Sequence, residues 1–289
     1  MTVLEVIQRS TDFLKRKGVD SPRLQVELLL AHRLKMPRLQ LYLDFERVLA
    51  AYELEAIREM VCRRGSREPL QHILGSTSFC GLEIVVNPDV LVPRPETERL
   101  AESGWRFLNS LKFESATTPT ALDVGTGSGC IAIALAAKAA NARIHAIDIS
   151  DGALKVARAN AQLNQVSDRI EFIRAASLQE LPNNLRFDLI ISNPPYIPSG
   201  EIATLAPEVR DFDPRLALDG GEDGLKFYRC LAKDGRDRLS ASGRIMVEFG
   251  DAQEESVAAI FHQAGWLVDA IEKDLSGRPR ILIAHRGKD

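Results

Sequence analysis

The stretch ALDVGTGSGCIAIALA, residues 121–136, predicts a strand, a glycine-rich turn and a helix in direct succession. Gly125, Gly127 and Gly129 fall in the turn, and glycine lets the backbone adopt positive φ and approach a ligand closely. The N-terminus of the helix that follows favours a negatively charged group. A strand, turn and helix of this kind are typical of ligand-binding loops in doubly wound sheets.

The residues around this stretch alternate between strand and helix patterns. We expect strands at about 119–124, 143–148, 169–174, 187–192 and 243–249, and helices at about 129–139, 151–164 and 223–239. Residues 265–286 should form a final pair of antiparallel strands. The predicted fold class is therefore α/β, a doubly wound and mostly parallel sheet with helices on both faces.

The chain before this sheet is different in character. Residues 1–75 contain three amphipathic helical runs, of which the first ends at Gly18 and the second has Pro22 in its first turn. We interpret 1–75 as a small all-α domain. Its 13 Lys+Arg against 10 Asp+Glu leave a balance of +3, which suits either an acidic partner or an ordinary solvated helix surface.

A β pattern separates the two regions. Between residues 76 and 92, apolar residues alternate over LEIVV, the sequence NPD predicts a turn, and VLV (90–92) predicts a second short strand. We interpret 76–92 as a β-hairpin linker. Residues 93–289 then form the α/β domain, which begins with a helix from Glu96 to about Leu111.

The composition is that of an ordinary globular protein, with 45% hydrophobic and 27% charged residues among 289. The longest apolar runs are far short of a membrane span, and the N-terminus lacks the pattern of a signal peptide. We expect a cytoplasmic monomer with no membrane segment. Scattered cysteines and histidines predict no metal site, and the net charge of -3 argues against direct nucleic-acid binding.

The glycine turn favours one cofactor over another. Gly125, Gly127 and Gly129 give G-x-G-x-G, whereas a dinucleotide fold would have glycine at position 130, where this chain has Cys. With Asp123 two residues before the turn, the pattern favours S-adenosyl-L-methionine over a nicotinamide. Asp148 ends the next strand and could accept the ribose hydroxyls. Alternatively, it could cap the helix that follows.

The stretch DLIISNPPYIP (188–198) places Asn193, Pro194, Pro195 and Tyr196 at the end of another buried strand. Open α/β sheets bind ligands at this edge. The Asn193 side-chain oxygen and the Pro194 carbonyl are two acceptors that suit a planar –NH2 group, and Tyr196 can stack on a planar substrate. Acceptors placed there would help a poorly nucleophilic amide nitrogen to attack a methyl group. The alternative is a proline-rich turn with a core tyrosine.

Taken together, these motifs resemble those of the PrmC/HemK proteins, release-factor-specific glutamine methyltransferases. Besides DVGTGSG and NPPYIP, the resemblance rests on PLQHILG, PRPETE, VRDFDPRLALDGGEDGL, VEFGDAQ and KDLSGRPR, and it covers nearly the whole chain. It implies a Rossmann-like class I S-adenosyl-L-methionine-dependent methyltransferase fold whose last strand is antiparallel. NPPY by itself also occurs in DNA and RNA amino-methyltransferases, which remain the alternative function.

The resemblance implies methylation of the glutamine amide in the Gly-Gly-Gln motif of peptide chain release factors 1 and 2, which tunes translation termination. S-adenosyl-L-homocysteine would be the product, and the helical domain would help to dock the release factor. Carried over by position, Asn193, Pro194, Pro195 and Tyr196 would be catalytic. The cofactor would be bound by Gly125, Thr126, Gly127, Ser128, Gly129, Asp148, Ser177 and Asn193.

Two other parts of the resemblance bear on the cofactor. Ala176 stands where the family commonly has an acid that would meet the adenine amino group, so adenine recognition would fall to backbone groups, with Ser177 as candidate. Arg94 and Glu98 of PRPETE would lie near the cofactor pocket, or alternatively form an ion pair that braces the domain junction.

Overall fold

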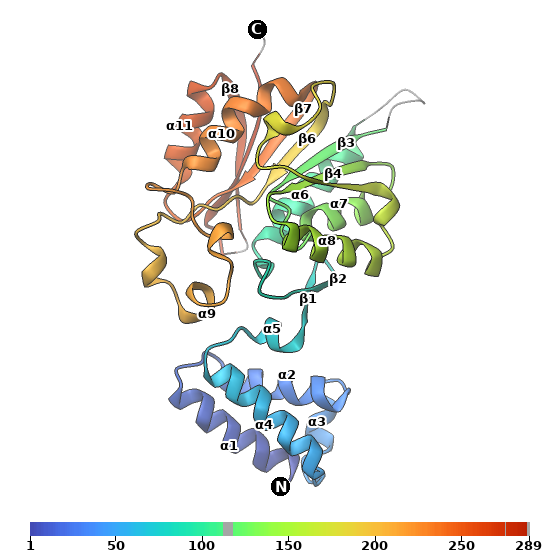
Figure 1. Cartoon of the computed structure of the whole chain (residues 1–289), viewed down its shortest axis with the longest axis vertical. Coiled ribbons are helices and arrows are strands. Elements are labelled where there is room, and N and C mark those ends of the chain that lie inside the picture. The colour runs from blue at the N-terminus through green and yellow to red at the C-terminus, as the bar shows by residue number, and fades with distance from the viewer. Residues whose placement is uncertain (112–117, 275, 288–289) are drawn as a thin grey trace. The chain divides into compact units, whose positions relative to one another are not determined.

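The computed structural model describes every residue of the chain except 112–117, 275 and 288–289. The chain forms two compact units. One comprises residues 1–76 together with the distant segment 206–212, and the other comprises 77–205 and 213–289 (Figure 1). The long connection after the Asn-Pro-Pro-Tyr stretch therefore contributes seven residues, 206–212, to the N-terminal helical unit.

The first unit is all-helical, as the amphipathic runs predict. Thr2 starts the first helix with a capping box, since its hydroxyl accepts from Glu5 N and the Glu5 carboxylate accepts from Thr2 N. The apolar faces of the long helices meet in one buried cluster. The helices of this unit are α1 (Val3–Arg16), α2 (Pro22–Leu34), α3 (Gln40–Leu43), α4 (Ala51–Gly65), α5 (Leu70–Leu74) and α9 (Pro207–Arg210).

Helix α9 is held in this unit by an ion-pair cluster. The Glu208 carboxylate accepts from Arg64 Nη2 at 2.7 Å and from Arg67 Nη2 at 2.6 Å. Burial alone would raise the pKa of Glu208, but the hydrogen bonds from Arg67 and Arg64 outweigh it and lower this pKa to about 2. Glu208 is therefore ionised throughout the neutral range.

A hairpin is present within the predicted segment 76–92, but its pairing differs from the prediction: the LEIV residues form its second strand, and the residues just before them form the first. Its strands are β1 (Ser76–Phe79) and β2 (Leu82–Val85), and the turn lies at Cys80–Gly81. The sequence VLV forms no strand. Val90 and Val92 are buried as core residues after a turn in which Val90 N donates to Asn87 O. Their alternation reflects packing against the core, and among the described residues no neighbouring strand pairs with them.

The second unit contains the predicted sheet, in the order β5-β4-β3-β6-β7-β9-β8. The first five of these strands are parallel, and β9 runs antiparallel to both β7 and β8. The strands are β3 (Thr120–Val124), β4 (Arg143–Asp148), β5 (Ile170–Arg174), β6 (Phe187–Ser192), β7 (Leu239–Glu248), β8 (Trp266–Lys273) and β9 (Pro279–Arg286). The predicted α/β class and antiparallel final strands are confirmed.

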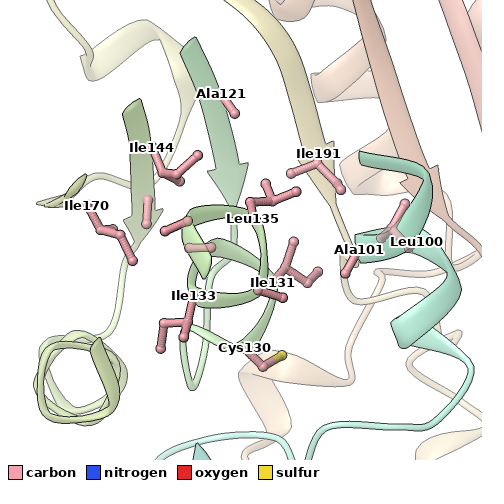
Figure 2. Packing of buried hydrophobic residues seen from close by; sticks show 14 of the residues in the cluster. Leu100, Ala101, Ala121, Cys130, Ile131, Ile133, Leu135, Ile144, Ile170 and Ile191 are labelled. Carbon is pink, nitrogen blue, oxygen red and sulfur yellow. The ribbon is translucent and has the colours of Figure 1, made fainter. Parts of the chain in front are cut away.

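Helices cover both faces of this sheet because its strands are apolar on both sides. Ala121 of β3 belongs to the cluster beneath the helices that follow β2 and β3, as Figure 2 shows with residues of α6 and α7. Its neighbour Leu122 belongs to the cluster on the other face. The first face is covered by α6 (Thr97–Ser110), α7 (Cys130–Lys138) and α8 (Asp151–Leu163), and the second by α10 (Lys226–Gly235) and α11 (Glu254–Gln263).

The predicted element bounds differ from the observed ones mainly around α10. The sequence predicts one helix over 223–239, whereas α10 ends at Gly235 and is followed by a 3-10 turn, Arg236–Arg238. Leu239 already belongs to β7. Across the described ranges, no helix has both the length and the apolar character needed to cross a bilayer.

Candidate active site

The two loops singled out in the sequence follow adjacent central strands, and both leave the sheet at the carboxyl ends of those strands. β3 is paired with β4 on one side and with β6 on the other. The chain order reverses at β3, and ligands bind at such a switch point beyond the carboxyl ends of the strands. Ser192, the last residue of β6, donates its hydroxyl to Val124 O at 2.7 Å. This bond ties together the strand ends from which residues 125–129 and 193–196 depart.

The glycine loop has the backbone geometry that its sequence predicts. Gly125, Gly127 and Gly129 have φ values of +73°, +55° and +81°, a region that favours glycine. A Cβ atom at Gly125 or Gly127 would meet no protein atom within 4 Å. The backbone of the loop therefore faces open space ahead of α7. A ligand with a polar and negatively charged end fits such a surface.

Asp123 supports this loop from below. Its carboxyl group is fully buried, and its Oδ2 accepts from Thr126 Oγ1 at 2.6 Å and from Ala132 N at 3.2 Å. Burial raises the pKa of Asp123 to about 7 in spite of these hydrogen bonds. Asp123 thus joins the strand, the turn and the first turn of α7, and its side chain is enclosed by the protein.

Asp148 lies beside the same loop, at the end of β4. Its Oδ2 accepts from Gly127 N and its Oδ1 accepts from Ser150 N, both at 2.9 Å. The N-cap of α8 is Ser150, whose hydroxyl accepts from Ala153 N, so Asp148 does not cap that helix. A carboxylate offers about four acceptor positions, and Asp148 keeps capacity for hydroxyl donors of a ligand.

Ser177 follows β5 and is half-buried, next to the exposed Ala176. The backbone N–H of Ala176 donates to the Glu180 Oε2 at 3.1 Å. A carboxylate therefore lies beside the position that lacks the expected acid, although it comes from a residue four positions further along the chain. Sequence comparison at the single position 176 gives no sign of it.

The Asn193–Tyr196 loop is held by residues from distant parts of the chain. Asn193 Nδ2 donates to Thr97 Oγ1 at 3.0 Å, and Gln253 Nε2 donates to Tyr196 O at 2.9 Å. No residue in the described part of the chain donates to Asn193 Oδ1 or to the Pro194 carbonyl. Neither of the two acceptors that the sequence predicts is therefore engaged by a donor from the described residues.

Tyr196 packs against two glycine-containing turns, with its ring beside Gly250 and its backbone carbonyl beside Gly224. A Cβ atom at Gly250 would lie 2.9 Å from Tyr196 Cδ2, and one at Gly224 would collide with the Tyr196 carbonyl oxygen. Burial raises the pKa of Tyr196 to about 12, so its phenol stays protonated at neutral pH. The absence of side chains at Gly224 and Gly250 allows the loop to pack closely against the segments that follow α9 and β7.

Known proteins resemble this chain over nearly its whole length. Residues 5–75 match the PrmC N-terminal domain model, and residues 102–208 match the methyltransferase small domain model. A release factor glutamine methyltransferase of Geobacter sulfurreducens is 40% identical over 281 residues, covering 97% of this chain and 95% of the relative. One from Chlorobaculum tepidum is 44% identical over 250 residues, covering 86% and 85%.

The chain belongs to the release factor glutamine methyltransferase family. Solved structures share its fold at low identity. A methyltransferase from Pyrococcus furiosus has a TM-score of 0.52 at 20% identity, covering 73% of this chain and 92% of that one. The hMettl16 catalytic domain, solved with an RNA hairpin, has a TM-score of 0.54 at 16% identity, covering 83% and 82%. These likenesses support the Rossmann-like methyltransferase fold of this family member.

Two residues of the PRPETE stretch have partners other than each other. Arg94 Nη2 lies 2.7 Å from Asp213 Oδ2, and Glu98 Oε1 accepts from Cys80 N at 2.9 Å. The alternative of an Arg94–Glu98 ion pair is therefore wrong. Each side chain fixes a different segment, the connection after α9 in one case and the hairpin turn in the other.

Three further residues around the Asn193–Tyr196 loop were not singled out from the sequence. They are Thr97, Glu248 and Gln253, which lie in the stretches PRPETE and VEFGDAQ that carry the family resemblance. Glu248 is 2% exposed, and burial raises its pKa to about 7 although Thr97 and Arg280 act in the opposite direction. Their position within stretches shared with the family was the only indication in the sequence that they are functional. Their contacts with the Asn193–Tyr196 loop could be seen only in the folded structure.

Proposed function

We propose that this protein transfers a methyl group from S-adenosyl-L-methionine to the side-chain amide nitrogen of a glutamine in release factors 1 and 2. The acceptor would be the glutamine of the Gly-Gly-Gln motif. Its methylation would tune translation termination in the cytoplasm. The observation that carries the proposal is the Asn193 amide, whose Nδ2 is bonded to Thr97 while Oδ1 has no donor among the described residues.

The acceptor geometry suits a primary amide. An amide –NH2 carries two N–H donors, and Asn193 Oδ1 and the Pro194 carbonyl would each accept one of them. The amide nitrogen is a poor nucleophile because its lone pair is delocalised into the carbonyl. Two fixed acceptors favour the pyramidal nitrogen, and they interact more strongly as positive charge develops on it.

Holding the amide nitrogen close to the methyl group supplies a further part of the rate acceleration. Tyr196, whose ring is packed beside Gly250, would form one wall for the planar amide, and Pro195 would limit the motion of the loop. After transfer, the methylated amide cation is strongly acidic and can lose its proton to water. We therefore assign no side chain the role of a strong base.

The cofactor would lie on the glycine loop. S-adenosyl-L-methionine supplies an electrophilic methyl group on sulfur and leaves as S-adenosyl-L-homocysteine. Gly125 to Gly129 would contact its polar end through the backbone, and Asp148 would accept from the ribose hydroxyls. Ser177 would lie near the adenine. Because residues 125–129 and 193–196 leave adjacent strands, the donor and acceptor groups would meet at the switch point.

The helical unit of residues 1–76 and 206–212, most of which matches the PrmC N-terminal domain model, would provide docking for the release factor. Docking by a separate unit would allow the acceptor loop to be selective for a glutamine although its four residues only recognise an amide. Direct binding of nucleic acid is not part of this proposal.

The decisive experiment incubates the protein with labelled cofactor and a release factor, either wild type or with the Gly-Gly-Gln glutamine replaced by alanine. We expect label on the wild-type factor only. Label that persists on the alanine variant would contradict the assigned acceptor. Label transferred to DNA or RNA in place of the release factor would overturn the proposal in favour of a nucleic-acid amino-methyltransferase.

A further inference from the structure

Asn160 of α8 is a buried polar residue that the proposed mechanism does not use. The residue is 0% exposed. Asn160 Nδ2 donates to Val85 O and to Ser128 O, both at 2.9 Å, and Asn160 Oδ1 accepts from Val85 N at 2.8 Å. One side-chain amide therefore links strand β2 of the hairpin to the glycine loop, from a position 75 residues after Val85 and 32 residues after Ser128.

The hairpin side of this link is a firm support. Val85 ends β2, and its N–H and C=O both bond to the Asn160 amide, as they would to a neighbouring strand. Ile84 and Val86, on either side of it, are buried in the core cluster that also contains residues of α8. To move away from α8, the hairpin would have to expose these two side chains and break both bonds to Val85.

The loop side of the link requires α8 to lie very close to the glycine loop. A Cβ atom at Gly129 would be 3.0 Å from the Ala157 Cβ and 3.2 Å from the Ala157 Cα. Ala157 is three residues before Asn160 and therefore lies on the same face of α8. A glycine at position 129 and a small residue at position 157 bring the helix near enough for the Asn160 amide to reach Ser128 O.

Asn160 completes the fixation of a peptide that the turn itself holds on one side. In the Ser128–Gly129 peptide, Gly129 N donates to Thr126 O at 2.8 Å, which is a bond within the turn. The carbonyl lies on the opposite side of the trans peptide and accepts from Asn160. Ser128 is 3% exposed. Without the amide, this buried carbonyl loses its donor, which favours loop conformations in which the carbonyl can reach water.

We propose that Asn160, acting through Ser128, is the positioning residue that holds the glycine loop in its cofactor-binding shape, with the hairpin as its support. The inference rests on the proposed function, since it concerns the loop on which we place S-adenosyl-L-methionine. The cofactor would bind only those molecules whose loop has this shape, so the apparent affinity falls in proportion to their fraction. The three hydrogen bonds of Asn160 go to β2 and the glycine loop, and the methyl transfer itself should therefore not depend on it.

The first experiment compares two α8 variants by calorimetry with S-adenosyl-L-homocysteine and by steady-state kinetics. Asn160→Ala should weaken binding and raise KM for the cofactor, each by about tenfold, the order expected for one lost buried hydrogen bond. Its kcat at saturating cofactor should stay within about twofold of the wild type. The matched control is Asn164→Ala, because Asn164 Nδ2 donates to Glu83 O of the same strand and to Asn160 O of the same helix. The control should bind the cofactor like the wild type.

The same two variants distinguish positioning of the loop from a general loss of stability. Destabilisation reduces the amount of folded protein but leaves the dissociation constant of the folded molecules unchanged. Hydrogen exchange of residues 125–129, measured by mass spectrometry without cofactor, should be about tenfold faster in Asn160→Ala than in Asn164→Ala. Dissociation constants or loop exchange rates that are alike in the two variants would overturn the inference.

A measurement on the wild type tests the inference even if Asn160→Ala does not fold. In nitrogen-labelled protein, the Asn160 side-chain –NH2 signals should exchange slowly with solvent. Saturation with S-adenosyl-L-homocysteine should slow this exchange about tenfold further, because the coupling between loop and ligand is reciprocal. The Asn164 signals should change little. The same response at both residues, or no response at Asn160, would overturn the inference. A protein that shows the Asn160 response but does not methylate release factors would contradict only the proposed function.

Discussion

The glycine loop and the Asn193–Tyr196 loop leave neighbouring strands of one sheet, but different kinds of contact hold them. Asp123 and Thr126, only three residues apart, bond beneath the glycine loop, and Gly127 N donates to Asp148 at the end of the next strand. By contrast, Asn193 is fixed by Thr97, 96 positions earlier in the chain, and Tyr196 O by Gln253, 57 positions later.

Two buried carboxyl groups differ in the same way, one having local partners and the other having partners from distant segments. Asp123 and Glu248 both have pKa values raised to about 7 by burial. Asp123 bonds to the loop that it precedes, so its surroundings are largely local. Glu248 is surrounded by groups from α6, the Asn193 loop and β9. A short motif can therefore specify a backbone ligand site by itself, whereas an oriented side-chain acceptor requires the assembled sheet.

The largest effect that we expect comes from removing the acceptor. Asn193→Ala should lower methyl transfer to the release factor by about 10²- to 10³-fold, the usual cost of losing one group that acts in the transition state. Cofactor affinity, measured by calorimetry, should remain within a few-fold of wild type, because the glycine loop holds its own structure. Full activity in Asn193→Ala would remove the side-chain acceptor from the mechanism.

Substitutions in the glycine loop should instead weaken cofactor binding or reduce stability. A Cβ atom at Gly127 would point into open space, where we place the cofactor, whereas one at Gly129 would approach Ala157 Cβ at 3.0 Å. Gly127→Ala should lower cofactor affinity by about tenfold or more at a stability cost of about 1 kcal/mol. Gly129→Ala should cost about 2 kcal/mol or more of unfolding free energy. Equal affinity losses without any difference in stability would contradict this distinction.

A smaller effect on kcat should follow from removing the hydrogen bonds that hold the Asn193–Tyr196 loop. Gln253 donates to Tyr196 O and accepts from Gly250 N, both at 2.9 Å. Gln253→Ala loses both bonds and should lower kcat by about tenfold, since a lost hydrogen bond is worth about 1 kcal/mol. Gln253→Glu keeps the bond from Gly250 N and loses the donor to Tyr196. If the two variants behave alike, the bond to Tyr196 carries the effect.

The smallest expected effect on turnover concerns the buried acid beneath the glycine loop. The folded-state pKa of Asp123 is raised from 3.8 to about 7, so between these values the folded protein holds a proton that the unfolded chain has lost. The unfolding free energy should therefore fall as the pH rises through this window. Asp123→Asn, measured by denaturant unfolding from pH 5 to 8, should show a shallower fall. A steeper fall in the variant would contradict the raised pKa.

Most of the fold could be predicted from the sequence because its determinants are local. Strand runs such as DLIIS and the glycine turn after ALDV are recognisable without any tertiary contact, and the structure places them where expected. The predictions fail where the alternation of buried residues resembles the pattern of a paired strand. Val90 and Val92 alternate like a strand but pack as core residues. Likewise, Arg94 and Glu98 are suitable partners by charge and spacing, yet each contacts a more distant segment.

By itself, the sequence determined the α/β class, the two loops at the sheet edge and the resemblance to release factor glutamine methyltransferases. Each of these depends on residues that are neighbours in the chain. Only the tertiary structure decided that Ser150 caps α8, that α9 belongs to the helical unit, and that Asn193 donates to Thr97. The physical reason is that the orientation of a side-chain amide depends on which donors and acceptors surround it in space, and periodicity along the chain does not report those contacts.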